Sequence, residues 1–120
     1  MRIVMDTNFI MEVVKNKIDL QKELKRVIDS NFELYVIEGT KEELEKIAET
    51  QRNKDRETAK IALELIKNIK TAQAEGKRVD EKLLDIAEKD TVIATHDKEL
   101  KKKIKGRKIV VRQKKYLQLV

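Results

Sequence analysis

The sequence of 120 residues contains no cysteine and no proline, and it has only four aromatic residues. Without cysteine there is no disulfide framework, no thiolate nucleophile and no zinc–thiolate site. This absence also fits a reducing compartment. The scarcity of aromatic side chains is against an RNA-binding module that stacks bases on an aromatic platform. If the protein binds RNA, we therefore expect backbone charge and shape to dominate recognition.

Long hydrophobic runs are also absent. No segment approaches the roughly 20 apolar residues that a membrane-spanning helix requires. Only Ile3, Val4 and Met5 precede the first acid, Asp6, which is too short a run for the apolar region of a signal peptide. We therefore expect a cytoplasmic protein. With 40% apolar residues, the chain is long enough to form one core, so we expect residues 1–120 to be a single domain.

Positive charge is concentrated at one end of the sequence. The formal net charge is +6, but residues 98–120 hold ten lysines or arginines against one acid, Glu99, a local balance of +9 that leaves −3 for residues 1–97. Such asymmetry indicates a polyanionic partner on one side of the molecule. The alternative is a solvated basic tail with no binding role, and charge alone does not separate the two.

The hydrophobic pattern alternates between strands and helices. Strand-like runs occupy residues 2–5, 33–37, 91–94 and 108–111. Helical spacing of apolar residues predicts helices at 7–15 and 19–29, a helix that opens at 39–40, a long helix that ends near 75–76, a helix that starts at 80 and a helix at 96–104. A wholly polar stretch at 51–56 marks a junction, and Ala62, Leu65, Ile66 and Ile69 are expected to face inward. Strands separated by helices need crossover connections. The sequence thus predicts an α/β fold of three layers, helix–sheet–helix, with a mainly parallel sheet.

Four acids fall where the carboxyl edge of such a sheet should lie. Asp6 follows the first strand, Glu43 lies in the helix after the second, Asp80 opens the helix before the third, and Asp97 follows the third. Ligands bind at this edge of open α/β sheets. Each acid also has a structural explanation, since Asp6, Asp80 and Asp97 suit helix N-caps and Thr40 with Glu43 matches a capping box.

Convergence of the four acids is harder to explain by capping. Two carboxylates about 5 Å apart repel by roughly 3 kcal/mol at an effective dielectric constant near 20. A cluster therefore needs protons or cations. Oxygen ligands, without cysteine and with a single histidine, favour Mg²⁺ or Mn²⁺ over zinc or copper. Such an ion activates water and neutralises charge on a phosphodiester.

At these residues the sequence resembles the PIN-domain nucleases. The matching segments, in the order found in that family, are Met5-Asp6-Thr7-Asn8, Glu43-Leu44, the acid and helix pattern that starts at Asp80, and Ile93-Ala94-Thr95-His96-Asp97. Together these segments span the chain. Position 96 departs from the pattern, because asparagine is more usual there than His96. The ending at residues 112–117 looks most like archaeal relatives of the small-subunit processome PIN nucleases, and VapC-type toxins are the other familiar branch.

The resemblance implies a metal-dependent endoribonuclease that leaves a 5′-phosphate and a 3′-hydroxyl. Asp6, Glu43, Asp80 and Asp97 would hold one or two Mg²⁺ or Mn²⁺ ions, and Asn8 and Thr95 would orient those acids or a bound water. The resemblance at the C-terminus favours a role in rRNA processing, with a VapC-type toxin as the alternative. The expected partners are RNA, a second copy of the chain and, for a toxin, an antitoxin. Candidate RNA-binding residues are Lys101, Lys102, Lys103, Lys105, Arg107, Lys108, Arg112, Lys114 and Lys115.

Two rival interpretations use the same fold class. In a non-catalytic RNA-binding module, the acids would only cap helices, and RNA affinity would depend on salt without metal-dependent cleavage. In a phospho-receiver-like domain, paired acids would follow an early strand, whereas Asp6 stands alone there. The presence of all four acids favours the nuclease.

Overall fold

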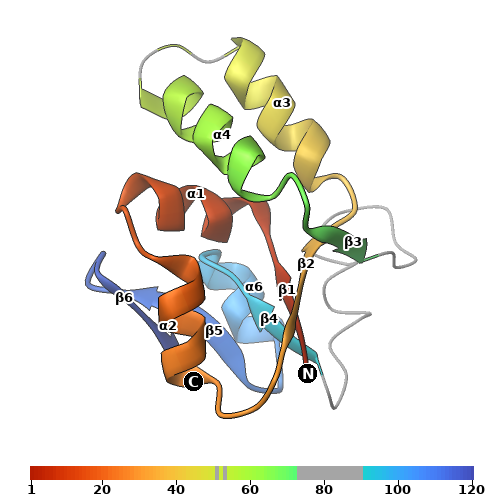
Figure 1. The fold of residues 1–120 in the computed structure, drawn as a ribbon, viewed down its shortest axis with the longest axis vertical. Helices are drawn as coiled ribbons and strands as arrows, with labels where there is room; N and C mark the ends of the chain where they lie inside the picture. The colour runs from red at the N-terminus through yellow and green to blue at the C-terminus, as the bar shows by residue number, and fades with distance from the viewer. Residues whose placement is uncertain (51, 53, 73–90) are drawn as a thin grey trace.

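A computed structural model describes residues 1–50, 52, 54–72 and 91–120 (Figure 1). Its strands are β1 (Arg2–Met5), β2 (Glu33–Ile37), β3 (Lys70–Ala72), β4 (Thr91–Ala94), β5 (Lys108–Arg112) and β6 (Tyr116–Leu119). Its helices are α1 (Thr7–Lys15), α2 (Leu20–Val27), α3 (Thr40–Thr50), α4 (Lys54–Leu65) and α6 (Lys98–Lys103). The helix expected from residue 80 lies outside the described residues. None of the described helices is long and apolar enough to cross a membrane.

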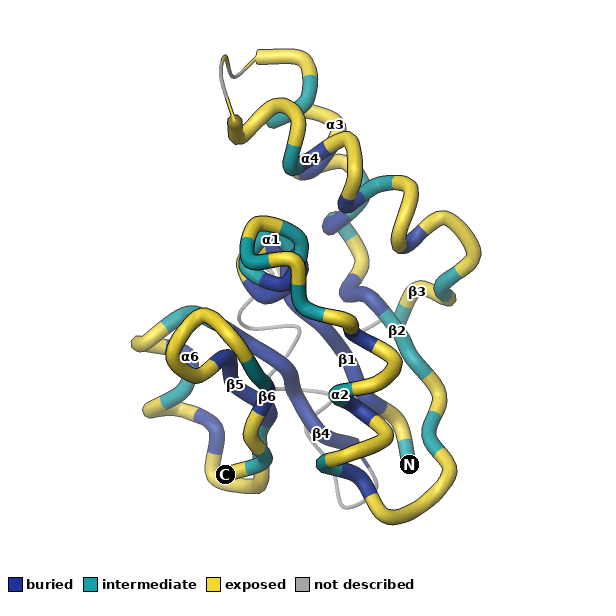
Figure 2. The backbone as a smooth tube through the Cα atoms, turned by 60° about the vertical axis from the view of Figure 1, so that its left-hand side comes forward, coloured by how far each residue is buried: buried dark blue, intermediate teal, exposed yellow. Residues whose placement is uncertain are grey.

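The strands form one sheet in the order β3-β2-β1-β4-β5-β6. Every neighbouring pair is parallel except β5 with β6. The expected α/β fold with a mainly parallel sheet is therefore confirmed. The central strands β1 and β4 are buried on both faces, as Figure 2 shows, which explains why their sequences are continuous apolar runs rather than alternating ones.

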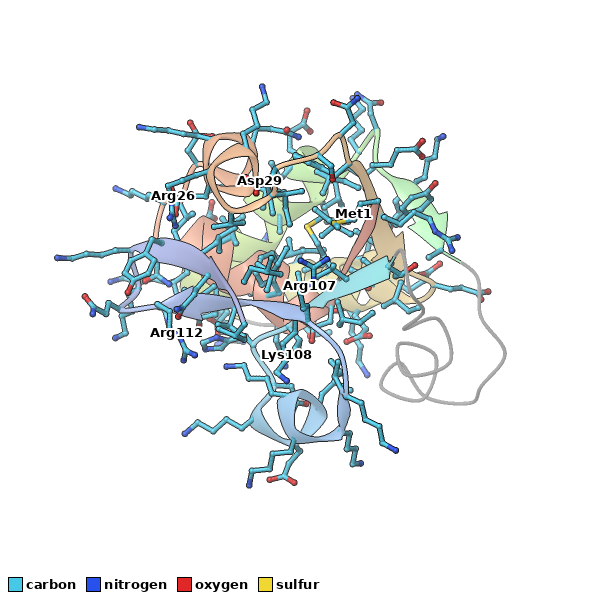
Figure 3. All side chains as sticks on the ribbon, turned by 90° about the horizontal axis from the view of Figure 1, so that it is seen from below. Met1, Arg26, Asp29, Arg107, Lys108 and Arg112 are labelled. Atoms are coloured by element: carbon cyan, nitrogen blue, oxygen red, sulfur yellow. The ribbon has the colours of Figure 1, made fainter. Side chains whose placement is uncertain are left out.

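Successive residues of the central strands enter two different cores. Ile3 and Met5 of β1 point into the larger core with α1 and α2. Val4 points to the opposite face, where Leu100 of α6 and Ile104, the residue after that helix, cover the sheet. This follows from the alternation of side chains along a strand. Helices α2 and α6 lie on opposite sides of the sheet in Figure 3. The helix–sheet–helix arrangement is thus built on two central strands whose consecutive buried residues are apolar: Ile3 to Met5 of β1 and Val92 to Ala94 of β4.

Helices α3 and α4 pack against each other and against α1, beyond the carboxyl ends of β1 and β2 (Figure 1). Helix α4 meets the core through small side chains, since Ala59 and Ala62 are fully buried, whereas α3 contributes the fully buried Leu44. Apolar residues on the outer side of α4 remain in solvent, with Ile61 58% and Leu65 39% exposed. The expectation that Leu65 faces inward is wrong, because Ala62 and Ile66 occupy the inner side of this segment.

Two strands were not expected from the sequence. The long helix was predicted to run to residues 75–76, but α4 ends at Leu65 and the chain forms β3 at Lys70–Ala72, paired with β2. A three-residue strand with two exposed positions has no detectable periodicity. Strand β6 follows a turn in which Gln113 and Lys114 both have positive φ, of 50° and 56°. Turns of this kind usually contain Asn-Gly, so the Gln-Lys sequence did not predict a hairpin here.

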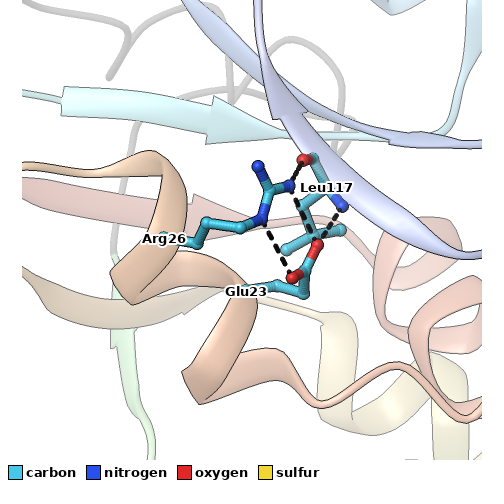
Figure 4. Close-up of polar contacts among 3 residues, drawn as sticks. All are labelled: Glu23, Arg26 and Leu117. Atoms are coloured by element: carbon cyan, nitrogen blue, oxygen red, sulfur yellow. Dashed lines mark hydrogen bonds and ion pairs between the residues drawn. The ribbon is translucent and has the colours of Figure 1, made fainter.

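The edge strand β6 is protected by two side chains of α2 (Figure 4). Lys108 and Val120 exchange two backbone hydrogen bonds. In an antiparallel pair only every second residue bonds to the neighbouring strand, so the N–H and carbonyl groups of Leu117 point away from β5. The Leu117 N–H donates to Glu23 Oε1 over 2.9 Å, and the Leu117 carbonyl accepts from Arg26 over 2.6 Å. Arg26 also donates twice to Glu23 and lies over the Tyr116 ring. The unpaired edge groups at Leu117 are thereby satisfied within the chain, which discourages edge-to-edge association.

We expect Glu23→Ala to lower the free energy of unfolding by about 1–2 kcal/mol, because it leaves the Leu117 N–H without its acceptor and removes the ion pair of Arg26. Hydrogen bonds from Arg26 and Leu117 lower the pKa of Glu23 below its usual 4.5. The stabilisation should therefore be complete above pH 4.5 and disappear as the pH falls through the lower pKa of the folded state. Urea denaturation at pH 7 and pH 3 measures this difference. Glu45→Ala, at an exposed α3 position, is the control, and equal losses in both variants would contradict the prediction.

Candidate functional site

The sheet register brings the ends of three strands to one level. Met5 of β1 lies beside Val36 of β2 and Ala94 of β4. The Asp6 N–H donates to the Ala94 carbonyl over 3.1 Å, and the Thr95 N–H donates to the Ile109 carbonyl over 3.1 Å. Asp6 and Thr95 are therefore the first residues past neighbouring strands. This is the edge at which ligands bind in open α/β sheets.

Asp6 is a buried carboxylate held by two donors. It is only 5% exposed, and its Oδ1 accepts the Phe9 N–H over 2.7 Å, which makes it the N-cap of α1. Its Oδ2 accepts a hydrogen bond from the Thr95 hydroxyl. Burial raises the pKa of Asp6 from 3.8 to about 6; the bonds from Thr95 and Phe9 oppose this shift, and repulsion from Asp97 and Glu43 adds to it. The capping explanation and the functional one therefore both apply to this residue.

Thr95 links Asp6 to Asp97. The Thr95 hydroxyl donates to Asp6 and accepts the Asp97 N–H over 3.1 Å. Asp97 in turn caps α6, since its Oδ1 accepts the N–H groups of Glu99 over 2.9 Å and Leu100 over 3.2 Å. One hydroxyl thus ties the end of β1 to the start of α6, and it holds two of the predicted acids at one edge.

Glu43 approaches the same edge from α3. The Thr7 hydroxyl, near the Glu43 carboxyl, donates to Oγ1 of Thr40 over 3.4 Å. Partial desolvation raises the pKa of Glu43, and the hydrogen bond from Thr7 opposes the shift. The predicted capping box is not formed as expected, because Thr40 is the first helical residue and is fully buried rather than an exposed N-cap. Thr7 and Thr40 were not predicted as site residues; the position of Thr7 directly after Asp6 was the available signal.

Three further residues named from the sequence are Asn8, Asp80 and His96. Asn8 is exposed in the first turn of α1. Asp80 lies outside the described residues. His96 is half-buried beside the site, with Nε2 3.8 Å from Glu12 Oε2, and Glu12 also accepts a hydrogen bond from Asn16 over 2.9 Å. The Nδ1 atom of His96 is buried and has no hydrogen-bond partner among the described residues.

The carboxylates suit a hard cation that keeps most of its water. Asp6, Asp97 and Glu43 are close enough for the first to be destabilised by the charges of the other two. Within the described residues, however, no three acids or histidines are grouped tightly enough to enclose an ion. Mg²⁺ is usually held by one or two carboxylates plus water and substrate phosphate. The buried, repelled carboxyl of Asp6 fits that mode better than a closed protein cage.

The predicted RNA-binding residues are mostly in solvent. Lys101 and Lys108 are half-buried, and the remaining ones are exposed: Lys102, Lys103, Lys105, Arg107, Arg112, Lys114 and Lys115. Lys108 Nζ donates to the Ile104 carbonyl over 3.4 Å, and Lys102 pairs with Glu99 over 3.8 Å. Desolvation first, and then repulsion from Arg112 and Lys98, lower the pKa of Lys101, whereas Asp6 and Asp97 oppose the shift. Lys101 is therefore close enough to Asp6 and Asp97 for their charges to stabilise its ammonium group.

A family described as PIN like domain matches residues 3–114 of the sequence. The chain belongs to the PIN-like domain family. Ribonuclease VapC4 of Methanocaldococcus jannaschii is 37% identical over 125 aligned positions, covering 98% of this chain and 95% of that protein. Ribonuclease VapC9 of Archaeoglobus fulgidus is also 37% identical, over 90% of this chain and 78% of that protein. The resemblance noted in the sequence is thus confirmed at family level.

Solved PIN structures show the same fold. The PIN domain endonuclease Utp24 superposes with a TM-score of 0.76 at 23% identity, covering 98% of this chain and 90% of that one. A chain of VapBC-1 from nontypeable Haemophilus influenzae superposes with a TM-score of 0.58 at 18% identity, over 87% of this chain and 92% of that one. At these identities the likeness establishes the architecture of this PIN-like chain.

We expect Asp6→Asn to raise the free energy of unfolding at pH 8 by up to about 3 kcal/mol in the presence of EDTA. The raised pKa of Asp6 means that the folded chain holds a proton more tightly than the unfolded chain, so wild-type stability should fall as the pH rises from about 4 to about 6 and stay low above that. Asparagine is as good an N-cap and does not ionise. Urea denaturation between pH 4 and pH 8 measures the effect. A variant that is less stable than wild type at pH 8 would contradict it.

Proposed function

We propose that this chain is a metal-dependent ribonuclease of the VapC type, which hydrolyses RNA phosphodiesters at the carboxylates Asp6, Glu43, Asp80 and Asp97. The observation that carries the proposal is the buried carboxyl of Asp6, which lies at the carboxyl edge of the sheet with Asp97 and Glu43 beside it. A purely structural N-cap does not need to be desolvated next to two like charges. A group with a perturbed pKa at such an edge is typical of a functional site.

In this proposal the site residues act on the carboxylates and on water. A bound Mg²⁺ or Mn²⁺ would supply charge neutralisation at the phosphate and a lowered pKa for an attacking water. Thr95 holds one oxygen of Asp6 and the Phe9 N–H holds the other, so the carboxylate is oriented before any ligand arrives. Thr7 lies near Glu43 and lowers its pKa, while its hydroxyl donates to Thr40 at the start of α3. Asn8 is exposed beside Asp6 and is available to contact substrate or water.

The comparisons favour the toxin branch over rRNA processing. Both relatives that exceed 30% identity are named VapC ribonucleases, and one covers nearly all of this chain. The likeness to Utp24, at 23% identity, supports the fold alone. A role in rRNA processing is therefore supported only by the resemblance of residues 112–117. The VapC alternative becomes the main proposal.

The expected partners follow from the same proposal. RNA is the proposed substrate, and the VapC relatives at 37% identity support an antitoxin as the proposed protein partner. A homodimer, a cytoplasmic location and a single domain over residues 1–120 stay predictions. The family match over residues 3–114 is consistent with the single domain.

We expect the purified protein to cleave RNA in Mn²⁺ or Mg²⁺ and to be inactive in EDTA. Asp6→Asn should lower the cleavage rate by roughly 10²–10³-fold, because the charge that would hold the cation is lost. Gel analysis of a labelled structured RNA and a labelled single-stranded RNA measures both, and end mapping tests for a 5′-phosphate. Expression of the wild type without an antitoxin should arrest growth, and Asp6→Asn should relieve the arrest. Equal cleavage by wild type and Asp6→Asn would exclude this site, and salt-dependent RNA binding without cleavage would favour the non-catalytic module.

We expect Thr95→Val to lower the cleavage rate by about 10–100-fold, since the variant keeps the shape of the side chain but removes the hydroxyl that orients Asp6. Thr91→Val, at the first residue of the strand that precedes Thr95, is the matched control, because the Thr91 hydroxyl is buried and has no hydrogen-bond partner among the described residues. Cleavage rates and urea denaturation curves of both variants give the comparison. A loss of activity in Thr91→Val as large as that in Thr95→Val would show that the effect is one of packing.

A further inference from the structure

Three basic side chains gather beside the acids at the carboxyl edge of the sheet. Asp97 caps α6, Lys98 is its first residue, and Lys101 lies one turn further on the same side of the helix. Arg112 reaches this edge from β5. Ala94 of β4 pairs with Ile109 of β5. Asp97 follows Ala94 by the same number of residues as Arg112 follows Ile109, so both lie toward the carboxyl ends of these strands.

Arg112 also faces α6. Ile109 and Val111 point into the core with α1 and α2, so alternation along β5 turns Arg112 to the other face of the sheet, which α6 covers. Figure 3 shows the labelled Arg112 on the same side of the sheet as α6. The Arg112 Nε donates to Gln118 over 2.7 Å, which fixes the guanidinium, and its terminal N–H groups have no acceptor among the described residues. Lys101 and Arg112 are close enough to repel each other.

Lys101 differs from its neighbours in having no counter-ion of its own. Lys102 pairs with Glu99, and Lys108 donates to the Ile104 carbonyl. Lys101 is half-buried, and among the described residues no acid lies within ion-pair distance of its ammonium group. Burial and repulsion by Arg112 and Lys98 lower the pKa of Lys101, which means that the fold disfavours the charged form of this side chain. An anion between Lys101 and Arg112 would remove that cost.

We propose that Lys101 and Arg112, with Lys98 at the rim, form the phosphate-binding half of the site and hold the non-bridging oxygens of an RNA phosphodiester against the carboxylates Asp6 and Asp97. This inference rests on the proposed nuclease function and assigns the substrate contacts of the same site. Arginine and lysine together supply several charge-assisted donors to one phosphate. The contacts carry no base specificity, which agrees with the scarcity of aromatic side chains in the sequence.

The test measures RNA binding separately from cleavage. Anisotropy of a 3′-fluorescein-labelled single-stranded hexanucleotide RNA, in EDTA at 100 mM salt, is compared for wild type, Lys101→Gln, Lys101→Arg, Arg112→Gln and Lys102→Gln. Lys25→Gln is the matched control, because it removes the same charge from α2 on the opposite side of the sheet. We expect about tenfold weaker binding for Lys101→Gln and for Arg112→Gln, less than about threefold for Lys101→Arg, and no change for Lys25→Gln.

The outcomes separate this inference from the proposed function. Weakening in Lys101→Gln and Arg112→Gln but not in Lys102→Gln supports the phosphate site even if no RNA is cleaved. Equal weakening in Lys101→Gln and Lys102→Gln would overturn it, because the whole basic segment would then bind RNA without a defined site. Unchanged binding in the exposed variant Arg112→Gln would also overturn it, and that variant does not disturb the core.

Discussion

The arrangement at the carboxyl edge depends on one interaction, the hydrogen bond from the Thr95 hydroxyl to the buried carboxylate of Asp6. It joins the residues that follow two adjacent strands. The same hydroxyl accepts the Asp97 N–H, so the start of α6 is positioned by the end of β1. The Phe9 N–H completes the arrangement by tying Asp6 to the first turn of α1. A carboxylate desolvated to this degree is costly without such donors, and it remains repelled by Asp97 and Glu43.

The two faces of the sheet serve this edge differently. The face with α1 and α2 buries most of the large apolar side chains, so it supplies the rigidity against which Asp6 is held. The face with α6 is a smaller core that contains Val4, Leu100 and Ile104. Because α6 is short and basic after its cap, this second face brings cations close to the acids. The acids and bases that we propose for a metal ion and for phosphate are thereby placed on one side of the edge.

Local pattern was sufficient for the central strands and for most helices. β1, β2 and β4 are short runs of apolar residues bounded by polar ones, and the structure places them where the pattern does. β3 and β6 were missed for a physical reason. Lys70–Ala72 is a strand only because β2 offers an open edge, and Tyr116–Leu119 depends on a left-handed Gln-Lys turn and on acceptors and donors from α2. Leu65 was assigned to the core because periodicity does not reveal which of two adjacent apolar stripes meets another helix.

The amino-acid sequence by itself determined the fold class, the family and the identity of the acids, because these depend on residue type and on order along the chain. Asp6 and Asp97 could be named from their positions after strands. Only the tertiary structure decided that Thr95 bridges them, that Thr7 joins α1 to Thr40 of α3 and that Lys101 and Arg112 face the same edge. These relations join residues up to 89 positions apart. They are set by sheet register and by the side of the sheet on which each side chain emerges, and neither quantity is encoded in local spacing.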